Sequence, residues 1–216
     1  MVIRSILAGA ILAASLAIPS PARATLILQS GLQGGSGDVA NVVFAPCGLN
    51  NQSGQTVQGC LNSSQSTRVN FTSNETLTTL EGGGQARIVA ADGAFDALNI
   101  QMANPLMGFG KMQFNLDTIS NGLATFAAVD QFGTVFNFGS FALRGSGQNF
   151  FTMSSLDGQV ATMFTMQSTV GIQNISDLQQ VRLGPTAIVP VPEPASLAMF
   201  GAGLLGLGIM RRKNLF

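Results

Sequence analysis

The two ends of the chain carry the features that most limit what it can fold into. Near the C-terminus, Ala195 to Met210 form a run of 16 residues without a charge, which is at the short end of the length of a membrane-spanning helix. Arg211, Arg212 and Lys213 follow directly, and basic residues in this position stay on the cytoplasmic side of a membrane. We therefore expect this segment to lie in the inner membrane and not in the folded core.

A proline-containing stretch precedes the apolar run. Pro192 and Pro194 hold φ at about −65° and cannot donate backbone hydrogen bonds, so residues 189–194 are predicted to stay extended and exposed. A protease or a transpeptidase binds such a peptide in its groove. The stretch from Val191 through Pro192-Glu193-Pro194, the apolar run and the basic end together resemble the PEP-CTERM sorting domain over residues 190–213. That domain occurs in exported proteins of Gram-negative bacteria that make exopolysaccharide.

The resemblance implies how the chain is handled in the cell. Val191, Pro192, Glu193 and Pro194 correspond to the motif thought to be read by exosortase, a membrane cysteine peptidase, so this chain would be the substrate and not the enzyme. Arg211 to Lys213 would form the membrane stop. The precursor would be anchored in the inner membrane and would then pass to the cell surface or the extracellular matrix. The alternative is an ordinary C-terminal membrane anchor with a proline-containing linker.

The N-terminal end has the pattern of a secretory signal peptide over residues 1–24. A basic residue, Arg4, precedes an apolar stretch from Ile6 to Ile18, and Ala22-Arg23-Ala24 forms an A-x-A site. This order predicts cleavage after Ala24 by signal peptidase, and hence export. An uncleaved N-terminal anchor is the alternative. The expected organisation is a signal peptide at 1–24, an ectodomain at 25–189 and a sorting tail at 190–213.

The exported body differs in charge from the whole chain. Residues 25–191 are about the size of one domain and long enough to bury a core. The complete sequence has no net charge, but the body has five basic and nine acidic residues, a difference of −4. No basic stripe is left, so binding to nucleic acid is excluded. The weakly charged, polar composition suits a hydrated exopolysaccharide matrix, and it also suits many secreted β-proteins.

Cys47 and Cys60 are the only cysteines of the chain. In a periplasmic or extracellular setting they are expected to pair. The bridge would close a loop of about 14 residues and contribute about 3 kcal/mol in the chain-entropy model. The alternative, a redox-active or nucleophilic cysteine, needs a base nearby, and the chain has no histidine to supply one.

Short apolar runs separated by Gly, Asn and Asp predict an all-β body, a single β-sandwich. Asp92-Gly93 is a hairpin signal. Along residues 160–166 both faces are fairly apolar, as expected where a sheet packs against a second sheet. No run outside the two end segments has helical periodicity. The expected strands are 85–92 and 94–102, 123–129 and 134–143, and 149–156 and 159–168.

A second, looser resemblance concerns the last part of the body. Residues 150–158 and 171–183 resemble the closing strands of many PEP-CTERM ectodomains. The resemblance implies that Asp177 to Arg182 form the last strand of a jelly-roll-like sandwich, and it implies no activity. Arg182 is expected to extend along the sheet edge or to pair with Asp177, with a ligand role as the alternative.

The composition lacks residues that several common catalytic sites need. Without histidine, Ser-His-Asp and Cys-His sites and histidine-bound zinc are excluded. Trp and Tyr, the usual stacking platforms for sugars, are also absent, and the 15 Phe residues are expected to form a core. A two-carboxylate glycosidase needs only a placed acid pair, but no pair stands out. Asp92 and Asp96, with Asp130 or Asp157, are weak candidates for calcium, although such residues mostly form the turn itself.

The sequence thus predicts an exported structural or adhesive protein of the cell surface or the exopolysaccharide matrix. No enzyme activity and no cofactor are expected. The main alternative is a secreted carbohydrate-binding module, and a hydrolase is a distant third. A glycan binder should have a calcium site or an exposed Phe cluster on one sheet face, whereas an enzyme should have a cleft with convergent carboxylates.

Overall fold

The body of the chain is all-β, as the sequence predicts. The computed structural model describes residues 25–34, 38–82, 85–156, 158–176 and 181–188, together with Gly201 and Leu204. These residues form a 12-stranded, mostly antiparallel sheet and one short 3-10 helix, η1. The predicted signal peptide and, except for Gly201 and Leu204, the predicted sorting tail lie outside the described residues.

The strands follow the alternation of apolar and polar residues. In β6, for example, Leu98, Ile100 and Met102 are buried, while Asn99 between them is exposed and Ala97 and Gln101 are partly buried, because successive side chains of a strand point to opposite faces. The elements are β1 (Thr25–Ser30), β2 (Ala40–Val43), η1 (Ala45–Cys47), β3 (Ser53–Leu61), β4 (Ser64–Gly82), β5 (Gln85–Ala90), β6 (Phe95–Met102), β7 (Met107–Thr118), β8 (Gly122–Asp130), β9 (Val135–Leu143), β10 (Asn149–Leu156), β11 (Ala161–Ser176) and β12 (Arg182–Ala187).

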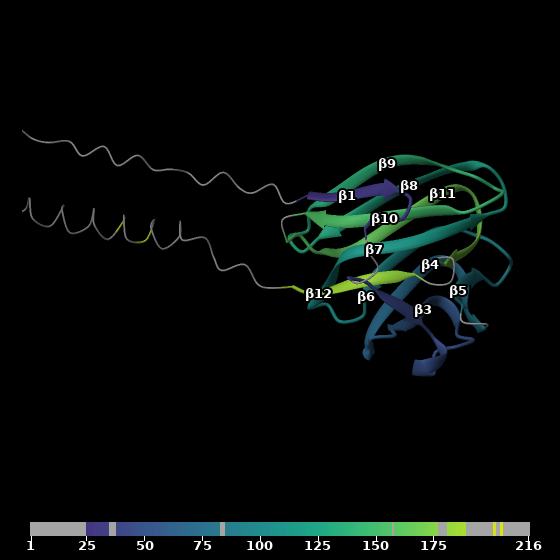
Figure 1. Ribbon diagram of the computed structural model, residues 1–216, viewed down its shortest axis with the longest axis horizontal. Helices are drawn as coiled ribbons and strands as arrows, with labels where there is room; N and C mark the ends of the chain where they lie inside the picture. The colour runs from purple at the N-terminus through teal and green to yellow at the C-terminus, as the bar shows by residue number, and fades with distance from the viewer. Residues whose placement is uncertain are drawn as a thin grey trace, which may run out of the picture.

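The sheet is folded over so that two layers face each other (Figure 1). β1, β10, β7 and β12 lie side by side in one layer, and β9, β8, β11 and β6 lie in the other. β2, β3 and β4 connect the two layers around one side of the molecule. The molecule therefore has the two packed layers of a sandwich, joined into one sheet.

Phenylalanine fills the space between the layers. Phe114 of β7 packs against Phe126 of β8 and Phe164 of β11, with ring centroids 5.9 and 5.5 Å apart. Phe151 of β10 lies 4.9 Å from Phe126 and 5.6 Å from Phe141 of β9. These spacings are those of favourable aromatic pairs. The expectation that the phenylalanines form a core is confirmed for these five residues, four of which are buried and one, Phe141, partly buried.

The strands predicted at 123–129 and 134–143 form as β8 and β9, which pair antiparallel. The hairpin predicted at Asp92-Gly93 is wrong, because β5 and β6 do not pair with each other. β5 and β6 each pair with β4 on one side and β11 on the other, so the chain keeps its direction through this turn and β6 continues where β5 ends. A local turn signal cannot distinguish a reversal of the chain from an interruption in a strand. The difference is decided by pairing with β4 and β11, which are distant in the sequence from this turn.

The closing strand also differs from the prediction. The last strand was predicted to run from Asp177 to Arg182, but β12 begins at Arg182 and ends at Ala187. It pairs with β2 on one side and β7 on the other. Residues 177–180, including Asp177, lie outside the described part. The Nε of Arg182 donates a hydrogen bond to Oδ1 of Asn41, 3.1 Å away on β2.

The disulfide prediction is confirmed. Cys47, at the end of η1, is bonded to Cys60 in β3. Cys60 is fully buried, and its strand pairs with β2 and β4. The bridge therefore ties the turn after β2 to the centre of the connecting sheet.

Both ends of the described body lie at the same end of the sandwich, which we call the tail pole (Figure 1). Thr25, where β1 begins, lies opposite Leu156 of β10. Continuing the β10–β7 register places Leu156 beside Phe109, which pairs with Pro185 near the end of β12. Thr25 and Pro185 thus lie in one row across four strands. We call the opposite end, where β6 and β8 begin and β7 ends, the far pole.

Candidate functional site

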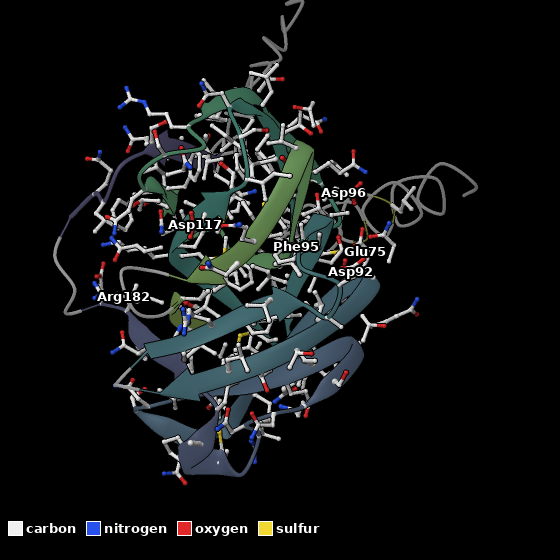
Figure 2. All side chains as sticks on the ribbon, turned by 90° about the vertical axis from the view of Figure 1, so that its right-hand side faces the viewer. Glu75, Asp92, Phe95, Asp96, Asp117 and Arg182 are labelled. Carbon is white, nitrogen blue, oxygen red and sulfur yellow. A yellow bond between two sulfur atoms is a disulfide. The ribbon has the colours of Figure 1, made fainter. Side chains whose placement is uncertain are left out.

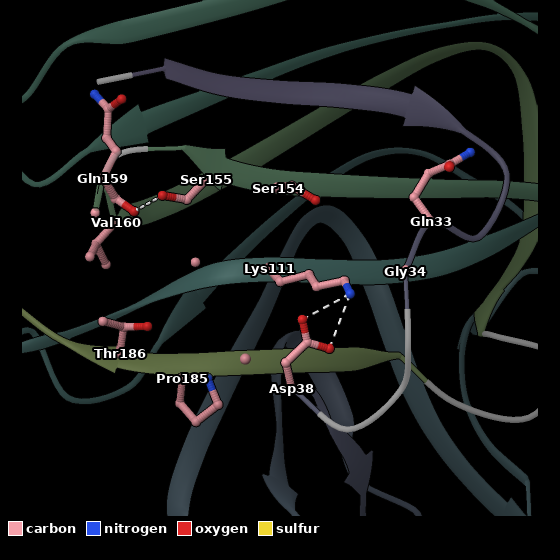
Figure 3. A pocket seen from close by; sticks show the side chains of 13 residues that line it. Gln33, Gly34, Asp38, Lys111, Ser154, Ser155, Gln159, Val160, Pro185 and Thr186 are labelled. Carbon is pink, nitrogen blue, oxygen red and sulfur yellow. Dashed lines mark hydrogen bonds and ion pairs between the residues drawn. The ribbon is translucent and has the colours of Figure 1, made fainter. Parts of the chain in front are cut away.

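A polar hollow of about 510 Å³ lies over β10, β7 and β12, close to the tail pole (Figure 3). Glycines open its floor: Gly110 on β7 and Gly184 on β12 have no side chain to fill it. Hydroxyl groups border it, from Ser154 and Ser155 on β10 and Thr186 on β12. The remaining lining residues are Gln33, Gly34, Asp38, Lys111, Gly158, Gln159, Val160 and Pro185.

One wall of the hollow is the connection between β1 and β2, and buried polar groups hold it in place. Gln113, almost fully buried, donates from Nε2 to the carbonyl of Gln33 at 3.0 Å. Thr152 donates from Oγ1 to the carbonyl of Gly31 at 2.8 Å and accepts from the backbone N–H of Gln33 at 3.0 Å. A Cβ at Gly184 would lie 2.6 Å from the carbonyl oxygen of Asp38. The missing side chain therefore lets this connection approach β12 closely.

An ion pair crosses the hollow. Nζ of Lys111 donates to both carboxylate oxygens of Asp38, at 3.0 and 2.9 Å. The Asp38 side chain is 61% exposed, whereas that of Lys111 is only 12% exposed. This hydrogen bond lowers the pKa of the Asp38 carboxyl below its ordinary value of 3.8. Because the two charges neutralise each other, the hollow offers mainly hydroxyl, amide and carbonyl groups, which suit hydrogen bonding to an uncharged polar ligand.

Sequence reasoning missed this hollow. Its residues come from β1–β2, β7, β10–β11 and β12, and none belongs to a recognised motif. The only local signal is the presence of glycines inside strands, at Gly110 and Gly184, since an interior glycine often marks a bulge or a close backbone approach. A register shift indeed lies beside Gly184, between it and Pro185.

Acidic residues gather at the far pole. Glu75, Asp92 and Asp96 lie near one another there (Figure 2). Burial raises the pKa of the Glu75 carboxyl above its ordinary value of 4.5, and the negative charges of Asp92 and Asp96 raise it further. Oε2 of Glu75 is buried and accepts no hydrogen bond. Sequence reasoning identified Asp92 and Asp96 but missed Glu75, which β4 brings in from elsewhere in the chain.

The suggested calcium ligands are brought together only in part, because Asp92 lies near Asp96 (Figure 2) but Asp130 lies elsewhere. Asp130 lies near the tail pole, opposite Ala161 at the start of β11, whereas Asp96 lies at the far pole. The buried Asp130 carboxylate accepts hydrogen bonds from the N–H groups of Phe132 and Thr134 and from Nε2 of Gln159. It therefore shapes the β8–β9 turn. Asp157 lies outside the described residues, and within those described no three His, Cys, Asp or Glu side chains are close enough to hold a metal ion.

The residues predicted to take part in sorting and cleavage all lie outside the described part of the chain: Val191 to Pro194, Arg211 to Lys213, Ala22 and Ala24. Within the described part of the chain, no helix has the length and apolar character needed to cross a bilayer.

The C-terminal prediction is confirmed by comparison with protein families. Residues 190–213 match the PEP-CTERM protein-sorting motif. The chain therefore carries this motif at its C-terminus, and the motif implies export to the cell surface and processing by an exosortase. No curated protein sequence matches the chain.

Solved structures with weak similarity include family 29 carbohydrate-binding modules. A module from Piromyces equi is 14% identical, with a TM-score of 0.31, covering 76% of this chain and 92% of the module. A variant of another family 29 module is 11% identical, also with a TM-score of 0.31, covering 68% and 90%. At these TM-scores the likeness does not establish a shared fold or a shared ligand.

Proposed function

We propose that the protein is an exported structural or adhesive component of the cell surface or of an exopolysaccharide matrix, anchored and processed through its C-terminal tail. The sorting motif at residues 190–213 carries this proposal. The signal peptide expected at residues 1–24 supplies the route of export. The ectodomain is a jelly-roll-like sandwich without an enzymatic role, and exosortase and signal peptidase are its processing partners.

The arrangement of the body supports an anchored precursor. The chain enters β1 at Thr25 and leaves β12 at Ala187, both at the tail pole. Because both ends leave the body at the same pole, one membrane can hold the chain through its C-terminal tail and, before signal-peptide cleavage, through its N-terminal end as well. Its polar, weakly charged surface suits a hydrated matrix.

A carbohydrate-binding module is the second candidate function. The hollow over β10, β7 and β12 favours it, because its hydroxyl groups and neutralised ion pair suit an uncharged saccharide. A module of this kind would bind purified neutral polysaccharide saturably and would release it with soluble oligosaccharide. A structural matrix component need not show saturable binding.

Substitution of Glu193 tests the sorting role. Glu193→Ala should leave unprocessed precursor in the inner membrane of the native host, because the Pro-Glu-Pro motif is what the processing enzyme reads. Intact mass and membrane fractionation provide the measurement: the parent protein should begin at Thr25 and end near Pro192, outside the inner membrane. Asp96→Ala, which removes an exposed acid at the far pole, is the matched control and should be processed normally.

If Glu193→Ala reached the surface like the parent protein, the role of the motif would be wrong. If the parent protein itself remained in the inner membrane and ended at Phe216, it would be a permanently anchored periplasmic domain. The matrix assignment would then be wrong as well.

A further inference from the structure

The tail pole carries exposed apolar side chains at the tips of its loops. Leu106, between β6 and β7, is 71% exposed, and Phe132, between β8 and β9, is 58% exposed. Val135 at the start of β9 and Leu156 at the end of β10 are 57% and 46% exposed. Single exposed apolar residues are ordinary, but these four share one end of the molecule with both chain ends.

Hydrogen bonds fix these loops at that end. The backbone N–H of Ile188 donates to the carbonyl of Leu106 at 2.9 Å, so the first loop adjoins the residue that follows β12. The N–H of Gln131 donates to the carbonyl of Val160 at 3.0 Å, so the β8–β9 turn adjoins the β10–β11 connection. The apolar tips are therefore part of an ordered surface.

The distribution of charge distinguishes the two poles. Glu75, Asp92 and Asp96 lie at the far pole, with Asp117 near the end of β7 (Figure 2), and outnumber the exposed Arg144, which follows β9 there. The far pole also has exposed apolar residues, Ile119, Leu123 and, just after the end of β1, Leu32, but it carries the four acidic side chains as well. The loops 103–106 and 131–134 contain no charged residue. The sequence places one acid, Asp157, after Leu156 and outside the described residues.

The length of chain between the body and the tail limits where this pole can be. Only residues 189–194 separate Ile188 from the uncharged run that begins at Ala195. Fully extended, they span roughly 20–25 Å. When the tail is in a bilayer, the end of β12 consequently stays within roughly 20–25 Å of the membrane surface, and the tail pole is the end of the body to which this tether is attached.

We propose that the tail pole is a membrane-contacting surface, on which Leu106, Phe132, Val135 and Leu156 enter the interfacial region of the bilayer while the precursor is anchored. The proposal rests on the anchored state of the proposed function. Contact through uncharged loops depends on buried apolar area. It should therefore occur on neutral phosphatidylcholine and be insensitive to salt, unlike attraction between exposed charges.

The absence of tryptophan and tyrosine from the chain allows a direct test. Phe132→Trp places a single tryptophan on the proposed surface, and Ile119→Trp places one at the far pole. The two positions match in exposure, at 58% and 57%. Phe200→Trp reports whether the tail itself has inserted. Each full-length variant is reconstituted in phosphatidylcholine vesicles with or without lipids brominated near the headgroup end of the acyl chains, after its melting is checked against the parent.

We expect brominated lipid to lower the emission of Trp at 132 by roughly twofold, as for an interfacial side chain, and to leave that of Trp at 119 unchanged. Leu106→Trp provides a second probe if the change at Phe132 disturbs its turn. Quenching at 200 without quenching at 132 and 106 would overturn the contact but leave the anchor intact. No quenching at any position would show that both the anchor and the contact are wrong. A blue shift at 132 that follows protein concentration and ignores brominated lipid would indicate a second copy of the chain, and would also overturn the proposal.

Discussion

At the scale of single residues, Glu75 connects structure to pH. Its carboxyl is partly buried beside Asp92 and Asp96, and the raised pKa means that the folded state disfavours the ionised form. The resulting loss of stability is fully present at pH values above the raised pKa. It disappears as the pH falls through that value toward the ordinary 4.5.

Glu75→Gln should therefore increase the free energy of unfolding at neutral pH, because it removes the ionised group and keeps its shape. The gain over the parent should shrink as the pH falls and vanish below about 4.5, where the Glu75 carboxyl of the parent is protonated and therefore uncharged, like the Gln side chain of the variant. Thermal or denaturant unfolding at a series of pH values measures this difference. Asp92→Asn, which removes one neighbouring charge, should give a smaller gain. A less stable Glu75→Gln at neutral pH would mean that the carboxylate makes a stabilising interaction instead.

At the scale of elements, the close approach of β7 and β11 depends on Gly108. A Cβ at this position would overlap the carbonyl oxygen of Ala161 and Cγ1 of Val160. The carbonyl belongs to the backbone at the start of β11, where that strand pairs with β7, so it cannot move without displacing the strand. Two residues along, a Cβ at Gly110 would have ordinary contacts, the nearest being Oγ1 of Thr186 at 3.5 Å.

Gly108→Ala should accordingly lower the free energy of unfolding by about 1–3 kcal/mol, the usual effect of overpacking. Gly110→Ala is the matched control and should change stability by less than about 0.5 kcal/mol. Denaturant unfolding of the two variants provides the comparison. Equal stabilities would indicate that β7 and β11 do not approach as closely as the structure shows.

Pairing between distant elements is also where sequence reasoning was least complete. The six strands predicted from the alternation of apolar residues between 85 and 168 all form, as β5, β6, β8, β9, β10 and β11, but this pattern missed β7 in the same range. It also could not show that β5 and β6 follow one another between β4 and β11, because these two partner strands are remote in the sequence. The strand β12 was likewise placed too early, since pairing with β2 and β7, and not local composition, decides where it begins.

At the scale of the whole molecule, the two layers are held together by the aromatic core. Phe126 is buried and lies within 6 Å of four other rings, from both layers. Phe132 belongs to the same chain segment but is exposed at the tail pole. The pair therefore separates the contribution of the core from that of the proposed membrane surface.

Phe126→Ala should reduce the free energy of unfolding by about 3–5 kcal/mol, through lost burial and the cavity that remains. Phe132→Ala should leave it within about 0.5 kcal/mol of the parent. Equilibrium unfolding in denaturant measures both. If Phe132→Ala were as destabilising as Phe126→Ala, its ring would be part of the core and could not be available to lipid.

The sequence by itself determined the features that depend on local chemistry. An uncharged run followed by three basic residues, a Pro-Glu-Pro motif and alternating apolar residues can each be recognised in one short segment. Pairing of Cys47 with Cys60 followed from there being only two cysteines in an exported chain. Only the tertiary structure decided which distant segments meet: the hollow, the neighbours of Glu75, and the apolar loops that share a pole with both chain ends. The physical reason is that strand pairing and burial depend on contacts across the sheet and between its layers.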